Sequence, residues 1–170
     1  MLEEWHDFYL LIGGSAGALI GLLFVVVSLT GGMNENTERG RQLYISPIVV
    51  HFCVVLGSGG LAMAPHVAIP AAALLEGVAA LGGLIFLSLI ARWMFQAERA
   101  TVPHWSDPWW YGVLPAAIYA VMLLAAAIMP LWTPQALMLL AATQGALVAI
   151  SVRNAWDLIS WIAPRAKNAS

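Results

Sequence analysis

The residues of this chain that could take part in chemistry are few, and they stand inside long, mostly apolar runs. Glu76 interrupts the run from 70 to 91, and His51 interrupts the run from 47 to 64. A carboxylate at membrane depth costs about 2.5 to 3.5 kcal/mol on insertion scales, so acids kept there often lie on proton or ion pathways. Glu76 and His51 are therefore the leading candidate site residues.

Common catalytic patterns are absent from the sequence. It has no Gly-x-Ser-x-Gly elbow, no His-Glu-x-x-His motif, no paired-carboxylate spacing and no Walker or Rossmann glycine pattern. Ser58 and His51 are seven residues apart, which is about 10 Å along a helix and too far for a nucleophile and its base. We predict no catalytic residue and no cofactor. An enzyme that acts on a lipid or quinone near Arg92, Arg153 and Asp157 is kept as a third hypothesis.

Composition indicates that most of the chain is surrounded by lipid. The 170 residues are 61% hydrophobic and only 9% charged, whereas a soluble domain is about 25% charged. A soluble fold of this length could not bury so much apolar surface. The single cysteine, Cys53, excludes an internal disulfide.

Five apolar stretches are long enough to cross a hydrocarbon core of about 30 Å at 1.5 Å per residue. The predicted helices are residues 8–30, 42–64, 70–96, 108–129 and 134–162, within a single domain of residues 1–170. The last two begin at Asp107-Pro108 and Thr133-Pro134, where a capping residue precedes a proline. The predicted fold class is an all-α, polytopic membrane bundle with five transmembrane helices.

Basic residues fall only in alternate connections between these helices and at the C-terminal end. They are Arg39, Arg41, Arg92, Arg99, Arg153, Arg165 and Lys167. The N-terminus and the second and fourth connections have none. Because five crossings place the two sets on opposite sides, the positive-inside rule predicts an outside N-terminus and a cytoplasmic C-terminus. His6 and His66 are then predicted outside, with His104 inside and His51 between them, so no metal site is predicted.

This orientation places Glu76 roughly 10 Å below the outer surface. Its own face of helix 70–96 carries small residues and is predicted to pack, whereas the opposite, bulky face is predicted to meet lipid. The small residues are Ala72, Ala73, Ala79, Ala80 and Gly83, and the bulky residues are Leu74, Val78, Leu81, Ile85 and Leu89. Ser58 and Ser15 should lie at a similar depth and are predicted hydrogen-bond donors to the carboxyl group.

A second polar group is predicted near the middle of the bilayer. His51, Tyr119 and Gln144 come from three helices and fall at about one level. A neutral imidazole donates from one nitrogen and accepts at the other, so Tyr119 and Gln144 could both bond to His51. Together with Glu76 and Ser58 they form the predicted ligand or proton pathway. For Glu76 and His51 the first interpretation is structural, as hydrogen bonds that join helices, and the pathway is the alternative.

Two further features concern packing and the membrane boundary. Gly13, Gly17 and Gly21 recur every four residues, and Ser28 lies close to the same face, which predicts close approach of another helix. That helix could belong to the same chain or to another copy. At the inner boundary, Arg153 and Asp157 are four residues apart and are predicted to pair.

The run IGGSAGALIGLLFVVVSL, from Ile12 to Leu29, combines a small-residue stretch with Gly-Leu-Leu-Phe-Val and a Ser-Leu exit. It resembles the first helix of small bacterial multispanning proteins that many genomes carry as uncharacterised. The matching residues are Gly13, Gly14, Ala18, Gly21, Leu22, Leu23, Phe24, Val25, Ser28 and Leu29. The resemblance covers about one helix, and it implies a setting in the bacterial inner membrane without implying a mechanism.

We therefore expect an integral membrane helix-packing protein that serves as an accessory, regulatory or self-assembling module. Its expected partners are the lipid bilayer and either a second copy of the chain or another membrane protein, and the net charge of −2 does not favour nucleic acid. The alternative is an oligomeric ion or proton channel, or a small transporter, that uses Glu76 and the layer around His51. Five helices enclose little space, so a pore would need several copies.

Overall fold

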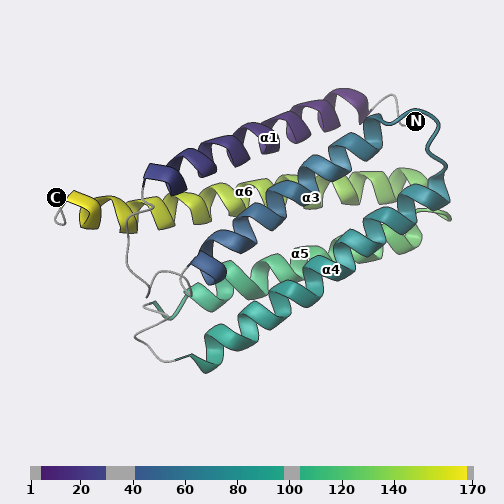
Figure 1. Cartoon of the computed structure of the whole chain (residues 1–170). Helices are drawn as coiled ribbons and strands as arrows, with labels where there is room; N and C mark the ends of the chain where they lie inside the picture. The colour runs from purple at the N-terminus through teal and green to yellow at the C-terminus, as the bar shows by residue number, and fades with distance from the viewer. Residues whose placement is uncertain (1–4, 30–40, 98–103, 168–170) are drawn as a thin grey trace.

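The computed structural model describes residues 5–29, 41–97 and 104–167, and within these ranges every regular element is helical and none is a strand. The α-helices are α1 (His6–Leu29), α3 (Ser46–Met63), α4 (Ile69–Gln96), α5 (Leu114–Ile128) and α6 (Thr133–Lys167). Two π-helical turns, η2 (Arg41–Ile45) and η3 (Trp109–Val113), lead into α3 and α5. Figure 1 shows their arrangement.

Five helical segments are long and apolar enough to cross a membrane, which confirms the predicted number within the described residues. They are His6–Ser28, Leu43–Met63, Ile69–Gln96, Trp109–Ile128 and Thr133–Ser160. The predicted limits agree with these segments to within two residues, and a helix extends clearly beyond its predicted limit only at the end of the last one. That helix, α6, continues to Lys167, five residues beyond the predicted end.

The two π-helical turns each precede a proline. Pro47 is the second residue of α3, and Pro115 is the second residue of α5. A proline ring clashes with the carbonyl group four residues earlier in an α-helix and offers no N–H. A π turn is wider than an α turn and moves that carbonyl group. The helix can therefore run through each proline without ending.

Successive helices alternate in direction (Figure 1). The last helix, α6, contacts α1 and α3 on one side and α5 on the other. One buried face of α6 follows a three-and-four-residue spacing, as expected of a helix packed on several sides. Its residues are Leu137, Leu140, Gln144, Leu147, Ser151 and Asn154. The central helix therefore carries polar groups into the interior at three levels.

The bundle has two distinct ends. The start of α1, the α3–α4 connection and the α5–α6 connection lie at one end, which we call the pocket end (Figure 1). The start of η2, the end of α4, η3 and the end of α6 lie at the other, which we call the basic end. Five of the seven basic residues lie on described elements that lead to the basic end, whereas Arg39 and Arg99 lie outside the described residues.

The outside of the bundle is apolar on every helix. On α4 the bulky face predicted to meet lipid is exposed, with Leu74 at 66% and Leu89 at 61% of full exposure. The small face is turned inward, where Ala80 and Gly83 are buried. The two-faced prediction for this helix is therefore confirmed, and it explains why Glu76 points into the protein.

Candidate functional site

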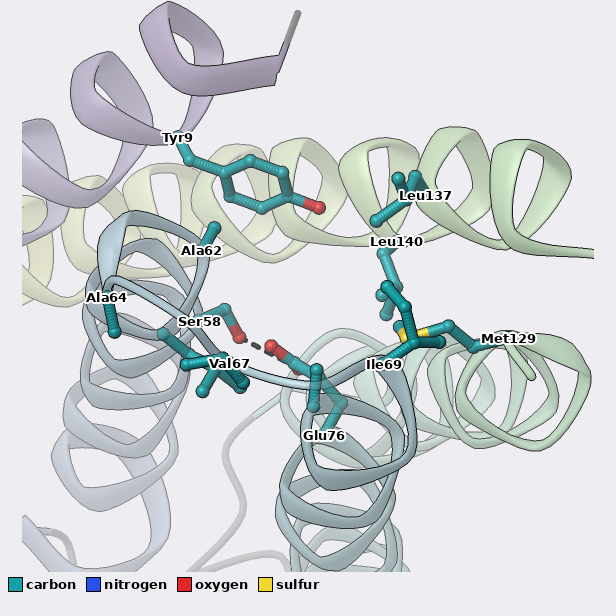
Figure 2. Close-up of a pocket in the computed structure, with 12 residues that line it drawn as sticks. Tyr9, Ser58, Ala62, Ala64, Val67, Ile69, Glu76, Met129, Leu137 and Leu140 are labelled. Carbon is teal, nitrogen blue, oxygen red and sulfur yellow. Dashed lines mark hydrogen bonds between the residues drawn. The ribbon is translucent and has the colours of Figure 1, made fainter. Parts of the chain in front are cut away.

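The candidate site lies at the pocket end and is built around the carboxyl group of Glu76. Glu76 is only 6% exposed, because the small face of α4 brings it against α3. The Ser58 hydroxyl of α3 donates a hydrogen bond of 3.0 Å to Glu76 Oε2. The structure thus contains the contact that the depth estimate predicted, and Figure 2 shows the two side chains facing each other.

Gln144 of α6 extends this pair into a chain of three residues. Its Nε2 donates to Ser58 Oγ at 2.9 Å, so that one hydroxyl accepts from Gln144 and donates to Glu76. Gln144 is fully buried, and its Oε1 has no hydrogen-bond partner among the described residues. Three helices, α3, α4 and α6, are therefore joined by one polar chain that ends at a carboxyl group.

A pocket of about 30 Å³ opens beside this carboxyl group. A buried water molecule needs roughly 10 to 15 Å³ by the same measure, so the pocket has room for about two. Its polar lining comes from Tyr9, Ser58 and Glu76, and the remaining lining residues are apolar. Figure 2 shows Tyr9 of α1 on the far side of the pocket from the Ser58–Glu76 pair.

The expected layer at mid-depth is only partly present. His51 Nδ1 lies 3.2 Å from the Tyr119 hydroxyl, and both side chains are fully buried. The prediction that Gln144 also bonds to His51 is wrong, because Gln144 bonds to Ser58 instead. His51 Nε2 has no partner within the described part of the chain. Ser58 and His51 are about 10 Å apart along α3, so the two polar groups are separate.

Ser15 and Ser28 do not take part in the site. The Ser15 hydroxyl donates to the Leu11 carbonyl group at 2.7 Å, and the Ser28 hydroxyl donates to the Phe24 carbonyl group at 2.8 Å. Each serine therefore bonds to its own helix, four residues back, which is a common way to satisfy a hydroxyl in an apolar surrounding.

The glycine stripe of α1 packs mainly against α3 of the same chain. A Cβ atom on Gly59 would lie 3.1 Å from Gly13 Cα and 3.0 Å from the Tyr9 carbonyl oxygen, so the two backbones are in contact. Gly17 faces Leu56 of α3, whereas a Cβ on Gly21 would meet nothing within 4 Å. The close approach was predicted. The helix that approaches Gly13 and Gly17 is α3 of the same chain, whereas the face of α1 at Gly21 is left uncovered by its described neighbours.

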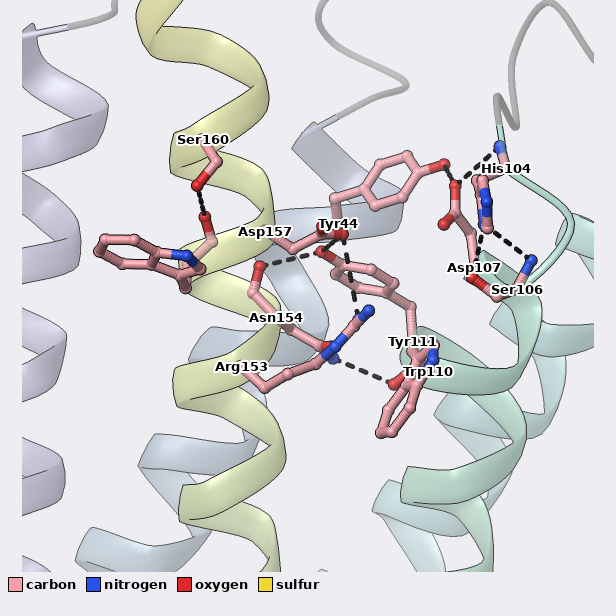
Figure 3. Close-up of polar contacts among 11 residues, drawn as sticks. Tyr44, His104, Ser106, Asp107, Trp110, Tyr111, Arg153, Asn154, Asp157 and Ser160 are labelled. Carbon is pink, nitrogen blue, oxygen red and sulfur yellow. Dashed lines mark hydrogen bonds and ion pairs between the residues drawn. The ribbon is translucent and has the colours of Figure 1, made fainter.

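At the basic end, Arg153 and Asp157 form the predicted pair within a larger network. Arg153 Nη1 lies 3.9 Å from Asp157 Oδ2, and it donates to Asn154 Oδ1 at 3.0 Å. Asn154 Nδ2 donates to the Trp110 carbonyl group at 3.0 Å. The Tyr111 hydroxyl lies 2.9 Å from the Asn154 carbonyl oxygen and 3.4 Å from Asp157 Oδ2 (Figure 3). The ion pair thus belongs to a set of polar interactions that together join η3 to α6.

The same network reaches η2 through Tyr44. Its ring meets the Tyr111 ring edge to face, with centroids 4.8 Å apart, and its hydroxyl donates to Asp107 Oδ2 at 3.0 Å. The His104 backbone N–H also donates to that oxygen, at 3.3 Å. The Asp107-Pro108 pair predicts a helix cap, whereas no motif in the sequence marks Tyr44, Tyr111 or Asn154 as members of a network. One signal could have found Asn154. Gln144, Ser151 and Asn154 are spaced by seven and then three residues, which places all three on one face of a helix.

No group of three His, Cys, Asp or Glu among the described residues is arranged to hold a metal. Comparison with protein-family models, with curated proteins and with solved structures gave no match to this chain. The functional conclusion therefore depends on the sequence and the geometry of this chain.

Proposed function

We propose that this chain is a multi-pass protein of the bacterial inner membrane, with the pocket end outside and the basic end in the cytoplasm. Five membrane-length helices and an apolar outer surface support the membrane setting. The basic residues gathered towards one end support the orientation under the positive-inside rule. The resemblance of the first helix supports the bacterial membrane.

Orientation is tested by labelling single cysteines with a membrane-impermeant maleimide in intact cells. The background is Cys53→Ala, because Cys53 is an exposed free thiol. We expect Ala64→Cys, in the α3–α4 connection, to be labelled from outside, and Ser106→Cys to be labelled only after the cells are opened. The reverse pattern would overturn the orientation, and labelling of both from one side would overturn the five crossings.

We further propose that the protein takes up protons at Glu76 from the outer side, as a subunit of an oligomeric proton channel or of a small proton-coupled transporter. The observation that carries this function is the carboxyl group itself. It is nearly buried, it has one side-chain hydrogen-bond donor among the described residues, Ser58, and it lines a pocket with room for water. A carboxyl group with a purely structural role would be expected to have its lone pairs filled by donors.

A proton fits this site better than a metal cation. A divalent cation with oxygen ligands takes about six or more of them, whereas the polar lining here consists of Glu76 and the hydroxyl-bearing Ser58 and Tyr9. Protonation, in contrast, needs one carboxyl group and access to water. The residues that line the pocket lie at the pocket end of the bundle, and within the described residues the pocket does not continue to the basic end. Passage across the membrane therefore requires either several copies or a conformational change.

Proton uptake is tested with the purified full chain in liposomes that contain a pH-sensitive dye, with a potassium gradient and valinomycin as the driving force. We expect a flux that Glu76→Gln reduces to the level of empty liposomes, because the amide keeps the shape and cannot exchange a proton. Ser88→Ala, which changes an exposed polar residue on the same helix, is the matched control and should leave the flux unchanged. Wild-type flux in Glu76→Gln would contradict the proposal.

The helix-packing accessory module remains a second candidate, and one observation favours it. Gly14, Gly21, Gly57 and Gly60 lie on α1 and α3 where an added Cβ would meet nothing within 4 Å. Small residues on an exposed helical face allow another membrane helix to approach closely. Flux at the level of empty liposomes for the wild type, together with a stable membrane partner retained in mild detergent, would favour this role.

A further inference from the structure

Arg153 is held in one position by contacts on one side of its guanidinium group. Nη1 donates to Asn154 Oδ1 at 3.0 Å, and the guanidinium carbon lies 4.3 Å from the centre of the Trp110 ring. Asn154 is itself fully buried and bonded to the Trp110 carbonyl group. The arginine therefore rests on an aromatic face beside a fixed acceptor, as Figure 3 shows. Such stacking orients a guanidinium group.

The other side of the group is open. Of the nitrogen atoms of Arg153, Nη1 alone has a partner within the described part of the chain, which leaves the Nε and Nη2 donors available. The side chain is 39% exposed. A guanidinium group has five N–H donors in a planar fork that matches two oxygens of a phosphate group. The free edge is therefore suited to bind an anion of that shape.

The depth of Arg153 identifies the source of the phosphate. Thr133 begins α6 at the pocket end, and Arg153 lies twenty residues later, which is about 30 Å along the axis and equal to the thickness of the hydrocarbon core. Trp156, one turn further on, is 73% exposed, and exposed tryptophans are enriched at this boundary. Lipid phosphates lie just beyond it.

We propose that Arg153, stacked on Trp110, binds the phosphate group of an anionic phospholipid in the leaflet at the basic end. Asp157 competes only weakly for the guanidinium group, because its oxygen is 3.9 Å from Nη1 and the residue is 54% exposed. The Tyr111 hydroxyl holds Asp157 Oδ2 from the other side at 3.4 Å. This inference rests on the proposed membrane setting, but it does not depend on proton uptake at Glu76.

Binding is measured by native mass spectrometry of the full chain in detergent, titrated with phosphatidylglycerol and, separately, with phosphatidylcholine. We expect Arg153→Gln to weaken phosphatidylglycerol binding about tenfold, because the charged fork is lost. Arg153→Lys keeps the charge without the fork and should restore only part of the affinity. Asp157→Asn should strengthen binding, since it removes the competing carboxylate. Arg92→Gln changes another exposed basic residue at the same end and should have little effect.

Several outcomes would overturn the inference. They are wild-type affinity in Arg153→Gln, an equal loss in Arg92→Gln, or equal binding of phosphatidylcholine. Inorganic phosphate that bound as tightly as the lipid would replace the lipid with a free anion and so overturn the lipid assignment. If Arg153→Gln fails to fold, the inference is tested by the other two variants: phosphatidylglycerol should bind more weakly to Arg153→Lys and more tightly to Asp157→Asn than to the wild type. Flux through Glu76 is measured separately, so either proposal can fail while the other stands.

Discussion

The two ends of the bundle bury polar groups in opposite ways. At the pocket end, Glu76 receives one side-chain hydrogen bond and faces an open pocket, and Gln144 Oε1 is left without a described partner. At the basic end, Tyr44, Tyr111 and Asn154 each have at least one hydrogen bond that joins separate segments. A dense network stabilises and orients helices, whereas a sparse one leaves a group free to react. We therefore expect loss of a polar group from the basic-end network to affect stability more than loss of a polar group beside the pocket.

The largest stability effect is expected at the basic end, from Asn154→Leu. This change removes the donor to the Trp110 carbonyl group and the acceptor for Arg153, so both lose a partner in a part-buried setting. We expect a loss of about 2 kcal/mol in the free energy of unfolding, measured in mixed micelles with a denaturing detergent. Glu76→Gln should change it by less than about 0.5 kcal/mol. Equal losses at the two ends would contradict the comparison.

A backbone contact near the pocket gives the next effect. Gly59→Ala would place a Cβ 3.0 Å from the Tyr9 carbonyl oxygen, so α1 and α3 must move apart. We expect a loss of about 1.5 kcal/mol, as in other overpacked interiors. Gly60→Ala, on the open side of the same turn, is the matched control and should be neutral or stabilising, since alanine favours the helix. If both changes were neutral, the backbones would not be in contact.

A smaller loss is expected when one bond of the tyrosine network is removed. Tyr44→Phe keeps the ring against Tyr111 but removes the donor to Asp107, which retains the His104 backbone N–H. Hydrogen bonds between membrane helices average about 0.6 kcal/mol, so we expect a loss of that size. Thermal unfolding of Tyr44→Phe and of the wild type would measure this loss. A loss above that for Asn154→Leu would make Asp107 the more important acceptor at this end.

The smallest effect is expected for Gln144→Met. The change removes the bond to Ser58, but it also removes a buried oxygen that has no described partner. The two contributions oppose each other, so the free energy of unfolding should change by less than about 0.5 kcal/mol. The same unfolding assay applies. A loss as large as that of Asn154→Leu would mean that Gln144 Oε1 has a hydrogen-bond partner. The polar groups at the pocket end would then be as fully hydrogen-bonded as those at the basic end.

Much of the fold could be predicted from the sequence because it depends on one-dimensional properties. The length of apolar runs gave the five helices, and the small and bulky residues around Glu76 gave the two faces of α4. Depth suggested both Ser58 and Ser15 as donors to Glu76; Ser58 makes that bond, and Ser15 bonds to its own helix instead. Each of these predictions needs only the helical repeat and the thickness of a bilayer.

The remaining contacts depend on how the helices other than α4 are rotated about their axes, which apolar length and depth do not specify. Gln144 lies near the level of His51, yet its amide group reaches Ser58 because of how α6 is turned and which way the side chain extends. The partner of Gly13 was ambiguous for the same reason. The tyrosine network was missed because it depends on two π-helical turns, and a proline near a helix start does not specify one.

Those two turns couple the angular positions of separate helices. Each π turn accommodates one residue more than an α turn, and one residue corresponds to about 100° of rotation. Conversion of η2 to α geometry would therefore swing Tyr44 around the axis of α3 and away from Tyr111, leaving Asp107 without its hydroxyl donor. Tyr111 lies in the other π turn, η3, so the contact between Tyr44 and Tyr111 couples the rotations of α3 and α5 about their axes. A rotation of either helix would also affect α6, because the Tyr111 hydroxyl donates to the Asn154 carbonyl group.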